Sequence, residues 1–127
     1  MRYCFRFLPL LVALALAGQA LSAAESKAVQ QIAGILMNLN HFPSDAEKET
    51  LKGIIAAKET TDHERTVAQA LLNVQHKVSG DDKPKLDAVV KDASAPESVK
   101  ALARIVANLN HTPSAEEKEQ LKKLTAQ

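Results

Sequence analysis

Cysteine and aromatic residues are nearly absent from this sequence. Its 127 residues include one cysteine, no tryptophan, one tyrosine and three phenylalanines. The lone cysteine, Cys4, has no partner for an intramolecular disulfide, so the fold must be stabilised by packing. The scarcity of aromatic rings disfavours binding of sugars or bases by stacking. A formal net charge of +1 offers no basic excess for a phosphate backbone, so we expect no nucleic-acid partner.

The first 23 residues have the three-part pattern of a secretory signal peptide. Two arginines give a basic start, residues 8–17 form an apolar run, and residues 18–24 are small or polar. The run is shorter than the roughly 20 residues that span a bilayer. We expect cleavage after Ala23, or equally well after Ala24, and export to the periplasm or alternatively secretion. An uncleaved N-terminal anchor is the competing interpretation.

Cleavage would leave residues 24–127 as a single domain without cysteine and with Phe42 as its only aromatic residue. Loss of Arg2 and Arg6 leaves 14 of the 16 basic residues against 15 acidic ones, a net charge near −1. This part has no second long apolar segment, so we expect no insertion into a membrane. A domain of this size buries roughly two thirds of its unfolded surface, which makes folding without disulfides feasible.

The pattern of apolar residues predicts an all-α fold of six short helices. Apolar positions recur at steps of three and four, and no run alternates as a strand would. Several expected starts pair a serine or threonine with an acidic residue three positions later, as in a capping box. The first helix is expected to begin near Ser26, and the expected caps of the other five are Ser44, Thr61, Ser79, Ser94 and Ser114.

A heptapeptide between helices is repeated along the chain. The segment 38–44, Asn-Leu-Asn-His-Phe-Pro-Ser, returns at 108–114 with one change, and an altered copy occupies 73–79. Residues 32–52 and 102–122 are identical at 13 of 21 positions. The histidines of the three copies are therefore 35 residues apart.

This period predicts three tandem 35-residue helical hairpins in a small solenoid-like stack or bundle. The expected units span about 26–60, 61–93 and 94–127. Backbone chemistry explains most of each turn, because asparagine tolerates the left-handed conformation that ends helices, proline stops the helix and serine caps the next one.

Histidine is not a preferred turn residue, yet it is present in all three copies. It could serve a metal site, a pH-responsive edge or packing between neighbouring turns. Helices in a linear stack lie about 8–10 Å apart, whereas zinc needs nitrogens at about 2.0–2.1 Å. The three histidines would then be too far apart for one ion, so the sequence predicts no metal site and no cofactor. Only strong curvature of the stack or a symmetric oligomer would bring them together.

The candidate binding residues all lie in the two better-preserved turns or are histidines of the repeat: His41, His76, His111, Asn38, Asn40, Asn108, Asn110 and Phe42. Phe42 is either a hydrophobic staple over the following helix or an exposed anchor for a partner. His63 lies outside the repeated heptapeptide and is expected to be a solvated surface residue.

No catalytic grouping is present in the sequence, so we expect no enzyme. The leading hypothesis is an exported binding or scaffold protein that recognises a protein or peptide. Leu124-Thr125-Ala126-Gln127 resembles the Leu-Thr-x-x-Gln segments of the Spy and CpxP family, with one intervening residue in place of two. That resemblance implies a periplasmic stress chaperone or sensor. A metal- or pH-responsive protein that uses the turn histidines is the third hypothesis.

Overall fold

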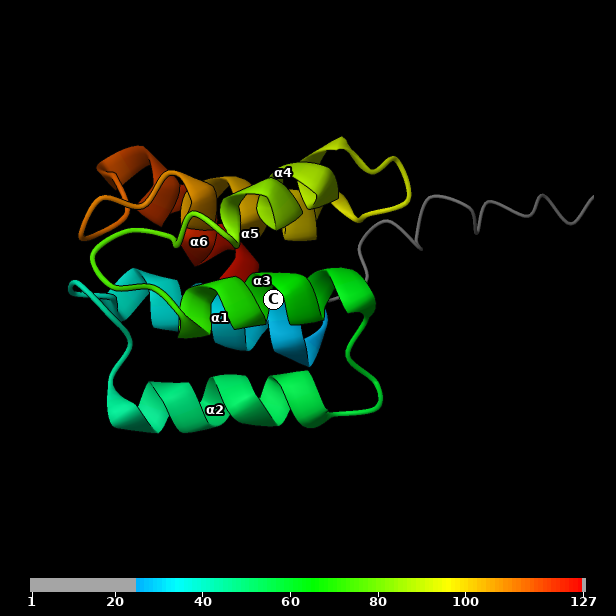
Figure 1. The fold of residues 1–127 in the computed structure, drawn as a ribbon, viewed down its shortest axis with the longest axis horizontal. Coiled ribbons are helices and arrows are strands. Elements are labelled where there is room, and N and C mark those ends of the chain that lie inside the picture. The colour runs from blue at the N-terminus through cyan, green and yellow to red at the C-terminus, as the bar shows by residue number, and fades with distance from the viewer. Residues whose placement is uncertain (1–24, 127) are drawn as a thin grey trace, which may run out of the picture.

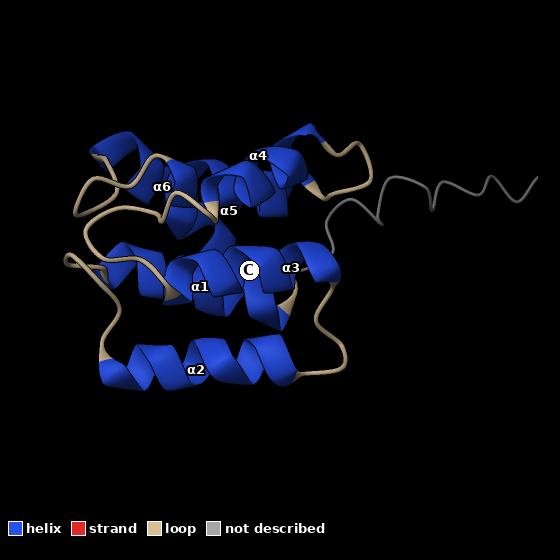
Figure 2. Cartoon of the chain, viewed as in Figure 1, coloured by secondary structure: helices blue, strands red, loops and turns tan. Residues whose placement is uncertain are grey.

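The structure is a computed structural model in which residues 25–126 are described. The expected signal peptide, 1–23, lies outside these residues. The described part is all-α and contains no strand (Figures 1 and 2). Its six helices are α1 (Lys27–Asn38), α2 (Asp45–Ala56), α3 (Asp62–Leu72), α4 (Lys83–Lys91), α5 (Glu97–Ala107) and α6 (Ala115–Thr125). The predicted fold class and the number of helices are confirmed.

The helices pack in pairs that differ from the expected hairpins. The most extensive packing joins α2 to α3, α4 to α5, and α1 to α6. Figure 1 shows α2 along one edge of the molecule, with α1 and α3 between it and the group of α4, α5 and α6. The arrangement of three tandem hairpins is therefore not confirmed, because the two helices of each expected unit are not each other's principal partners. Contact between α1 and α6 instead brings the two ends of the described chain together.

Helices α1, α3 and α5 supply most of the core and also contact one another. The helices α2, α4 and α6 cover them, and each contributes one fully buried leucine, namely Leu51, Leu86 and Leu121. Burial of a side chain of this kind stabilises a fold by about 1.5–3 kcal/mol. No helix within residues 25–126 is long and apolar enough to cross a membrane.

Three of the five expected helix caps are confirmed, and α1 also begins with a serine cap. The Ser26 hydroxyl accepts a hydrogen bond from the amide of Val29. Both bonds of a capping box are present at the starts of α2, α3 and α6, whose caps are Ser44, Thr61 and Ser114. The sequence pattern of a hydroxyl followed by glutamate three residues later therefore located these three starts.

The expected caps of α4 and α5 are wrong. The Ser79 hydroxyl accepts from the amide of Asp82 in a turn that precedes α4, so the helix begins three residues later than expected. Both the amide and the hydroxyl of Ser94 donate to the carboxylate of Asp92. Ser94 thereby closes a local turn, and Pro96 takes the cap position of α5.

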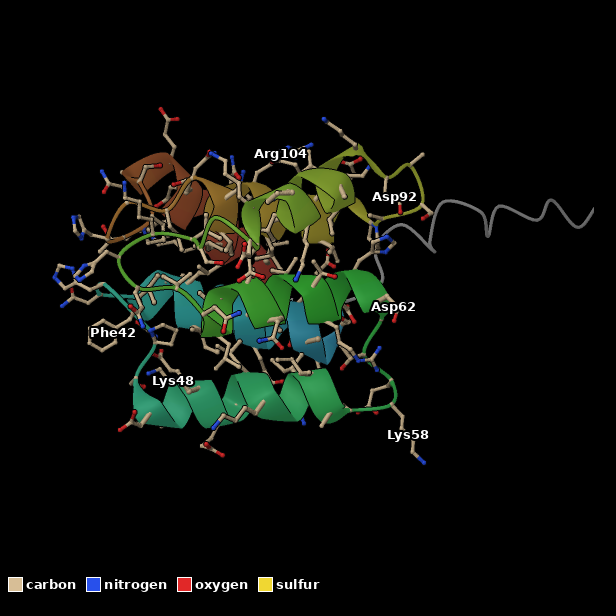
Figure 3. The ribbon with its side chains drawn as sticks, viewed as in Figure 1. Phe42, Lys48, Lys58, Asp62, Asp92 and Arg104 are labelled. Carbon is tan, nitrogen blue, oxygen red and sulfur yellow. The ribbon has the colours of Figure 1, made fainter. Side chains whose placement is uncertain are left out.

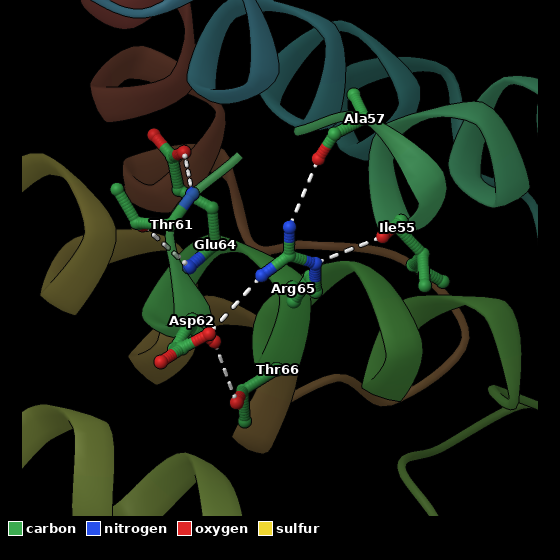
Figure 4. A network of polar contacts seen from close by, with 7 residues as sticks. All are labelled: Ile55, Ala57, Thr61, Asp62, Glu64, Arg65 and Thr66. Carbon is green, nitrogen blue, oxygen red and sulfur yellow. Dashed lines mark hydrogen bonds and ion pairs between the residues drawn. The ribbon is translucent and has the colours of Figure 1, made fainter. Parts of the chain in front are cut away.

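Arg65 ties the C-terminal end of α2 to α3 (Figure 4). Its Nε and Nη2 atoms each donate at 2.9 Å to the carbonyl oxygens of Ile55 and Ala57, and Nη1 donates at 3.0 Å to Asp62. Carbonyls at a helix end lack partners within the helix, so the planar guanidinium caps this end.

Candidate functional site: a ring of three histidine turns

His41, His76 and His111 occupy the turns α1–α2, α3–α4 and α5–α6. Their φ angles are 74°, 70° and 71°, and they are the only non-glycine residues with positive φ in the described chain. The residues that flank His41 and His111 are hydrogen-bonded to each other. The Phe42 amide donates to the Asn40 carbonyl, and the Thr112 amide to the Asn110 carbonyl, both at 2.9 Å. A three-residue turn whose central φ is near +75° is the rare, strained form of the γ-turn. At His76 the bond runs the other way, from the Gln75 amide to the Lys77 carbonyl at 3.3 Å. In all three turns the residues on either side of the histidine pair with each other, so each histidine lies at the tip of a tight turn.

The asparagines of these turns do not adopt the left-handed conformation expected of them. Positive φ in the described residues is confined to the histidines. Asn40 and Asn110 contribute backbone carbonyls to the γ-turns. The Asn38 side chain donates to the carbonyl of Gly34 at 3.2 Å, and Asn108 is the C-terminal cap of α5 with φ −96°. Asn38 and Asn108 thus lie at the ends of α1 and α5, while the histidines make the reversal.

The backbones of the three turns are joined in a closed ring of hydrogen bonds. The His41 amide donates to the His111 carbonyl at 2.9 Å, the His76 amide to the His41 carbonyl at 2.8 Å, and the His111 amide to the His76 carbonyl at 2.7 Å. Each histidine is thus both donor and acceptor. The ring fixes the three backbones relative to one another without help from the side chains.

The side chains of the three histidines converge at the surface. Their Nδ1 atoms are 3.1 Å apart between His41 and His111 and 3.2 Å apart in the other two pairs. The ring centroids are 5.0–5.1 Å apart, with edge-to-face arrangements. The expectation that these residues lie too far apart for one ion is therefore wrong. It assumed a linear stack, whereas the turns meet in a closed ring.

These histidines are the only group of three or more His, Cys, Asp or Glu residues in the described part that could hold a metal ion. Histidine is the commonest metal ligand in proteins, and its imidazole nitrogen suits zinc, copper, iron and nickel. The geometry therefore offers one ion three nitrogen donors on one face.

Phe42 lies beside this cluster and is half exposed, with 51% of its surface accessible. Its ring meets that of His76 edge to face at a centroid separation of 6.5 Å, and the Lys48 ammonium lies 5.7 Å from its centroid. Figure 3 shows Phe42 and Lys48 together at this end of the molecule. All three residues line a hollow of 370 Å³. An aromatic ring so exposed does not act as a buried staple.

The opposite end of α1 and α2 has a larger hollow of 500 Å³ that reaches the start of α3. The buried Glu64 carboxylate in its lining accepts one hydrogen bond from the Thr61 amide and another from the Ser26 hydroxyl. Both oxygens are therefore engaged in holding the two helix starts. The Glu64 carboxylate therefore serves the fold, and neither of its oxygens is free to bind a ligand.

His63 is not the solvated residue expected from the sequence. Its Nε2 atom lies 2.8 Å from a carboxylate oxygen of Asp92, which links the start of α3 to the α4–α5 connection. The hydrogen bonds of Ser94 and His63 to Asp92 hold the pKa of this carboxyl well below its usual range. The pair fastens two segments, and Figure 3 shows Asp92 at the opposite end of the molecule from Phe42.

Sequence analysis missed the roles of Lys48, Arg65 and Asp92. Lysine occupies the position of Lys48 in all three repeats, as Lys83 and Lys118 in the other two. This recurrence is the sequence signal that could have identified Lys48 as part of the site. Arg65 and Asp92 also make contacts that join separate segments, to the end of α2 and to His63 respectively, and nothing in the local sequence indicates these. No protein-family model, no curated protein and no solved structure matches this chain.

Proposed function

We propose that this protein binds one divalent transition-metal ion of the zinc class through the Nδ1 atoms of His41, His76 and His111. The observation that carries the proposal is the mutual separation of these atoms, 3.1–3.2 Å. Tetrahedral zinc, with nitrogens at 2.0–2.1 Å, requires donors about 3.3 Å apart. An ion at that distance from all three atoms would lie about 1 Å out of their plane.

Hydrogen bonding among the three rings supports the same proposal. A neutral imidazole nitrogen is either a donor or an acceptor. Each of the three Nδ1 atoms is therefore either a donor or an acceptor, so at least two of them are of the same kind. Two nitrogens of the same kind cannot hydrogen-bond to each other and repel. A cation that accepts all three lone pairs removes this conflict. The cluster is thus better suited to a metal ion than to a set of internal hydrogen bonds.

Backbone strain is a second, independent support. A non-glycine residue held at positive φ costs about 1–3 kcal/mol, and such residues concentrate at ligand sites. All three residues of this kind in the described chain are the proposed ligands. Glycine would adopt these turns without strain. The presence of histidine at each tip therefore favours a role for the imidazole itself.

We further propose that three 35-residue helix–turn–helix units close around the histidine ring, each contributing one ligand. The cyclic order of the backbone hydrogen bonds supports this arrangement. The equivalent residues Ala33, Ala68 and Ala103, each with no exposed surface, support it too. We place the protein in the periplasm on the basis of its signal-like N-terminus. Of the functions that the sequence left open, the geometry supports the metal-responsive one best.

The test is calorimetric titration of chelator-treated protein with Zn²⁺, combined with thermal unfolding. We expect one ion per chain. Zinc at 100 times its dissociation constant stabilises by about 2.7 kcal/mol, which raises the melting temperature by roughly 10 °C for a domain of this size. The variant with alanine at His41, His76 and His111 should show neither effect.

His63→Ala is the matched control, because His63 is a histidine outside the ring. It should bind zinc as the unmodified protein does, even if the protein is less stable. Zinc binding that survives the triple substitution, or wild-type protein that shows neither heat nor stabilisation, would contradict the proposal.

A further inference from the structure

We propose that the ion's fourth coordination position takes an aromatic carboxylate from outside the chain, held in the hollow beside Phe42, Lys48 and His76. This inference rests on the proposed metal site and names the class of ligand that completes it. It assigns a use to the 370 Å³ hollow that adjoins the histidine ring.

The three histidines leave one coordination position of the proposed ion open. Zinc is almost always four-coordinate, and a site with three protein ligands leaves one position open to water or to another ligand. Across residues 25–126, no further His, Cys, Asp or Glu joins the cluster. The fourth ligand must therefore come from outside the described chain.

The 370 Å³ hollow adjoins the histidine ring at His76. His76 belongs both to the ring and to the lining of the hollow, so a molecule bound there lies against one of the three proposed ligands. Its volume of 370 Å³ falls within the range of about 300–1,000 Å³ that is typical of small-molecule sites. Leu72 and Val74 also line it and add apolar surface. The hollow therefore suits a ligand with one metal-binding end and one apolar end.

The lining of the hollow combines a positive charge, Lys48, with an aromatic ring, Phe42. The ion and the Lys48 ammonium both favour a negatively charged group, and zinc accepts carboxylate oxygen as a ligand. The half-exposed ring of Phe42 offers a surface against which a second ring can stack. A carboxylate attached to an aromatic ring satisfies both features, as benzoate does.

The three turns differ in the residue that follows the histidine. Lys77 and Thr112 replace Phe42 in the other two copies, whereas Lys48 has counterparts in Lys83 and Lys118. Only one side of the ring thus combines an exposed aromatic residue with a lysine. That combination provides a matched control, because Lys118 occupies the same place in the third unit without an aromatic neighbour.

The experiment uses protein loaded with Co²⁺, whose visible absorption responds to a change of ligand. Benzoate and acetate are titrated separately into this protein. We expect benzoate to bind about tenfold more tightly than acetate, as stacking on one ring allows. Phe42→Ala should abolish that preference, and Lys48→Met should weaken both ligands. Lys118→Met should leave both affinities unchanged.

The outcomes separate this inference from the proposed function. If cobalt binds but benzoate and acetate are equally weak, or if Phe42→Ala keeps the preference, the ligand inference is overturned and the metal site stands. Equal effects of Lys48→Met and Lys118→Met would also overturn it. If neither cobalt nor zinc binds, both proposals fail.

Discussion

The backbone amide of His76 donates a 2.8 Å hydrogen bond to the carbonyl of His41, 35 residues earlier in the chain. This bond does not involve either imidazole. The position of each turn is therefore set by the backbone, and the side chain at its tip can be changed without removing the bond. This separation of backbone and side chain allows the role of the imidazoles to be tested directly.

His76→Gly and His76→Ala should differ in stability in the absence of metal. Both substitutions remove a proposed ligand, so both should abolish zinc binding. Glycine adopts a φ near 70° without steric cost, whereas alanine keeps the strain. We expect the glycine variant to be more stable than the alanine variant by about 1 kcal/mol. Urea unfolding in the presence of a chelator measures the difference.

An exposed helical position provides the control for this pair. At Lys52, on the surface of α2, the order should reverse, with glycine about 1 kcal/mol less stable than alanine. If alanine were as stable as glycine at position 76, the strain assigned to the turn would be wrong.

Copper should be bound in an unfavourable geometry. Opposite ligands in the square plane preferred by Cu²⁺ lie about 4 Å apart. The three Nδ1 atoms are nearly equidistant at 3.1–3.2 Å, and the backbone ring opposes their separation. We therefore expect at most two of the nitrogens to bind in the equatorial plane of the ion. Electron paramagnetic resonance of the copper-loaded protein, with its nitrogen couplings, measures this number.

Competition between the two metals gives a second measurement. Copper normally binds more tightly than zinc to a given set of ligands. Here its advantage should be smaller than for the free amino acid histidine. Three equatorial nitrogens, or an undiminished advantage of copper, would show that the ring opens to suit the ion.

Local features of the fold were predictable from the sequence because their causes are local. The capping boxes at Ser44, Thr61 and Ser114 depend on residues three positions apart, and all three are present. The start of α5 was not predictable, because Ser94 had two possible partners. Its contact with Asp92 is favoured over the capping of α5.

The histidine ring could be predicted only in part. Repetition identified His41, His76 and His111 as equivalent residues. It could not show that they meet, because a periodic apolar pattern is the same for an open stack and for a closed ring. The packing of α1 against α6 decides between the two. General preference favours asparagine at the left-handed position, yet Asn40 and Asn110 have Gln75 in their place in the middle copy, whereas the histidine beside them is present in all three turns.

Arg65→Ala should destabilise the protein through the loss of two hydrogen bonds to the end of α2. The side chain is about one-third exposed, which reduces the effect, and we expect a loss of about 1–3 kcal/mol. Arg65→Lys should restore little of it, because one ammonium cannot reproduce the fork that reaches both Ile55 and Ala57. Urea unfolding of the three proteins measures this. Lys52→Ala, which removes an exposed ion pair with Glu49, should change stability by less than about 1 kcal/mol.

Asp92 should make stability dependent on pH in the acid range. Hydrogen bonds from Ser94 and His63 lower the pKa of this carboxyl in the folded state. The ionised form therefore stabilises the fold above the unfolded value of about 3.9, and this contribution is lost as the pH falls through the lower folded-state pKa. Asp92→Asn should destabilise the protein at pH 7, and its difference from the wild type should shrink below about pH 4.

Unfolding in urea at a series of pH values checks this dependence. Asp87→Asn, at an exposed position of α4, is the control and should give a nearly constant difference. A difference for Asp92→Asn that stays the same down to pH 2 would contradict the account.

The packing of α1 against α6 has a consequence for the order of events during synthesis. Of the six described helices, α1 is made first, and its principal partner, α6, is made last. Contacts between such distant segments form late and slowly. Until then the packing that brings the α1–α2 and α5–α6 turns together is missing, although all three histidines are already present in the chain. The capture of a metal ion by all three would therefore mark a chain in which α1 and α6 have packed together.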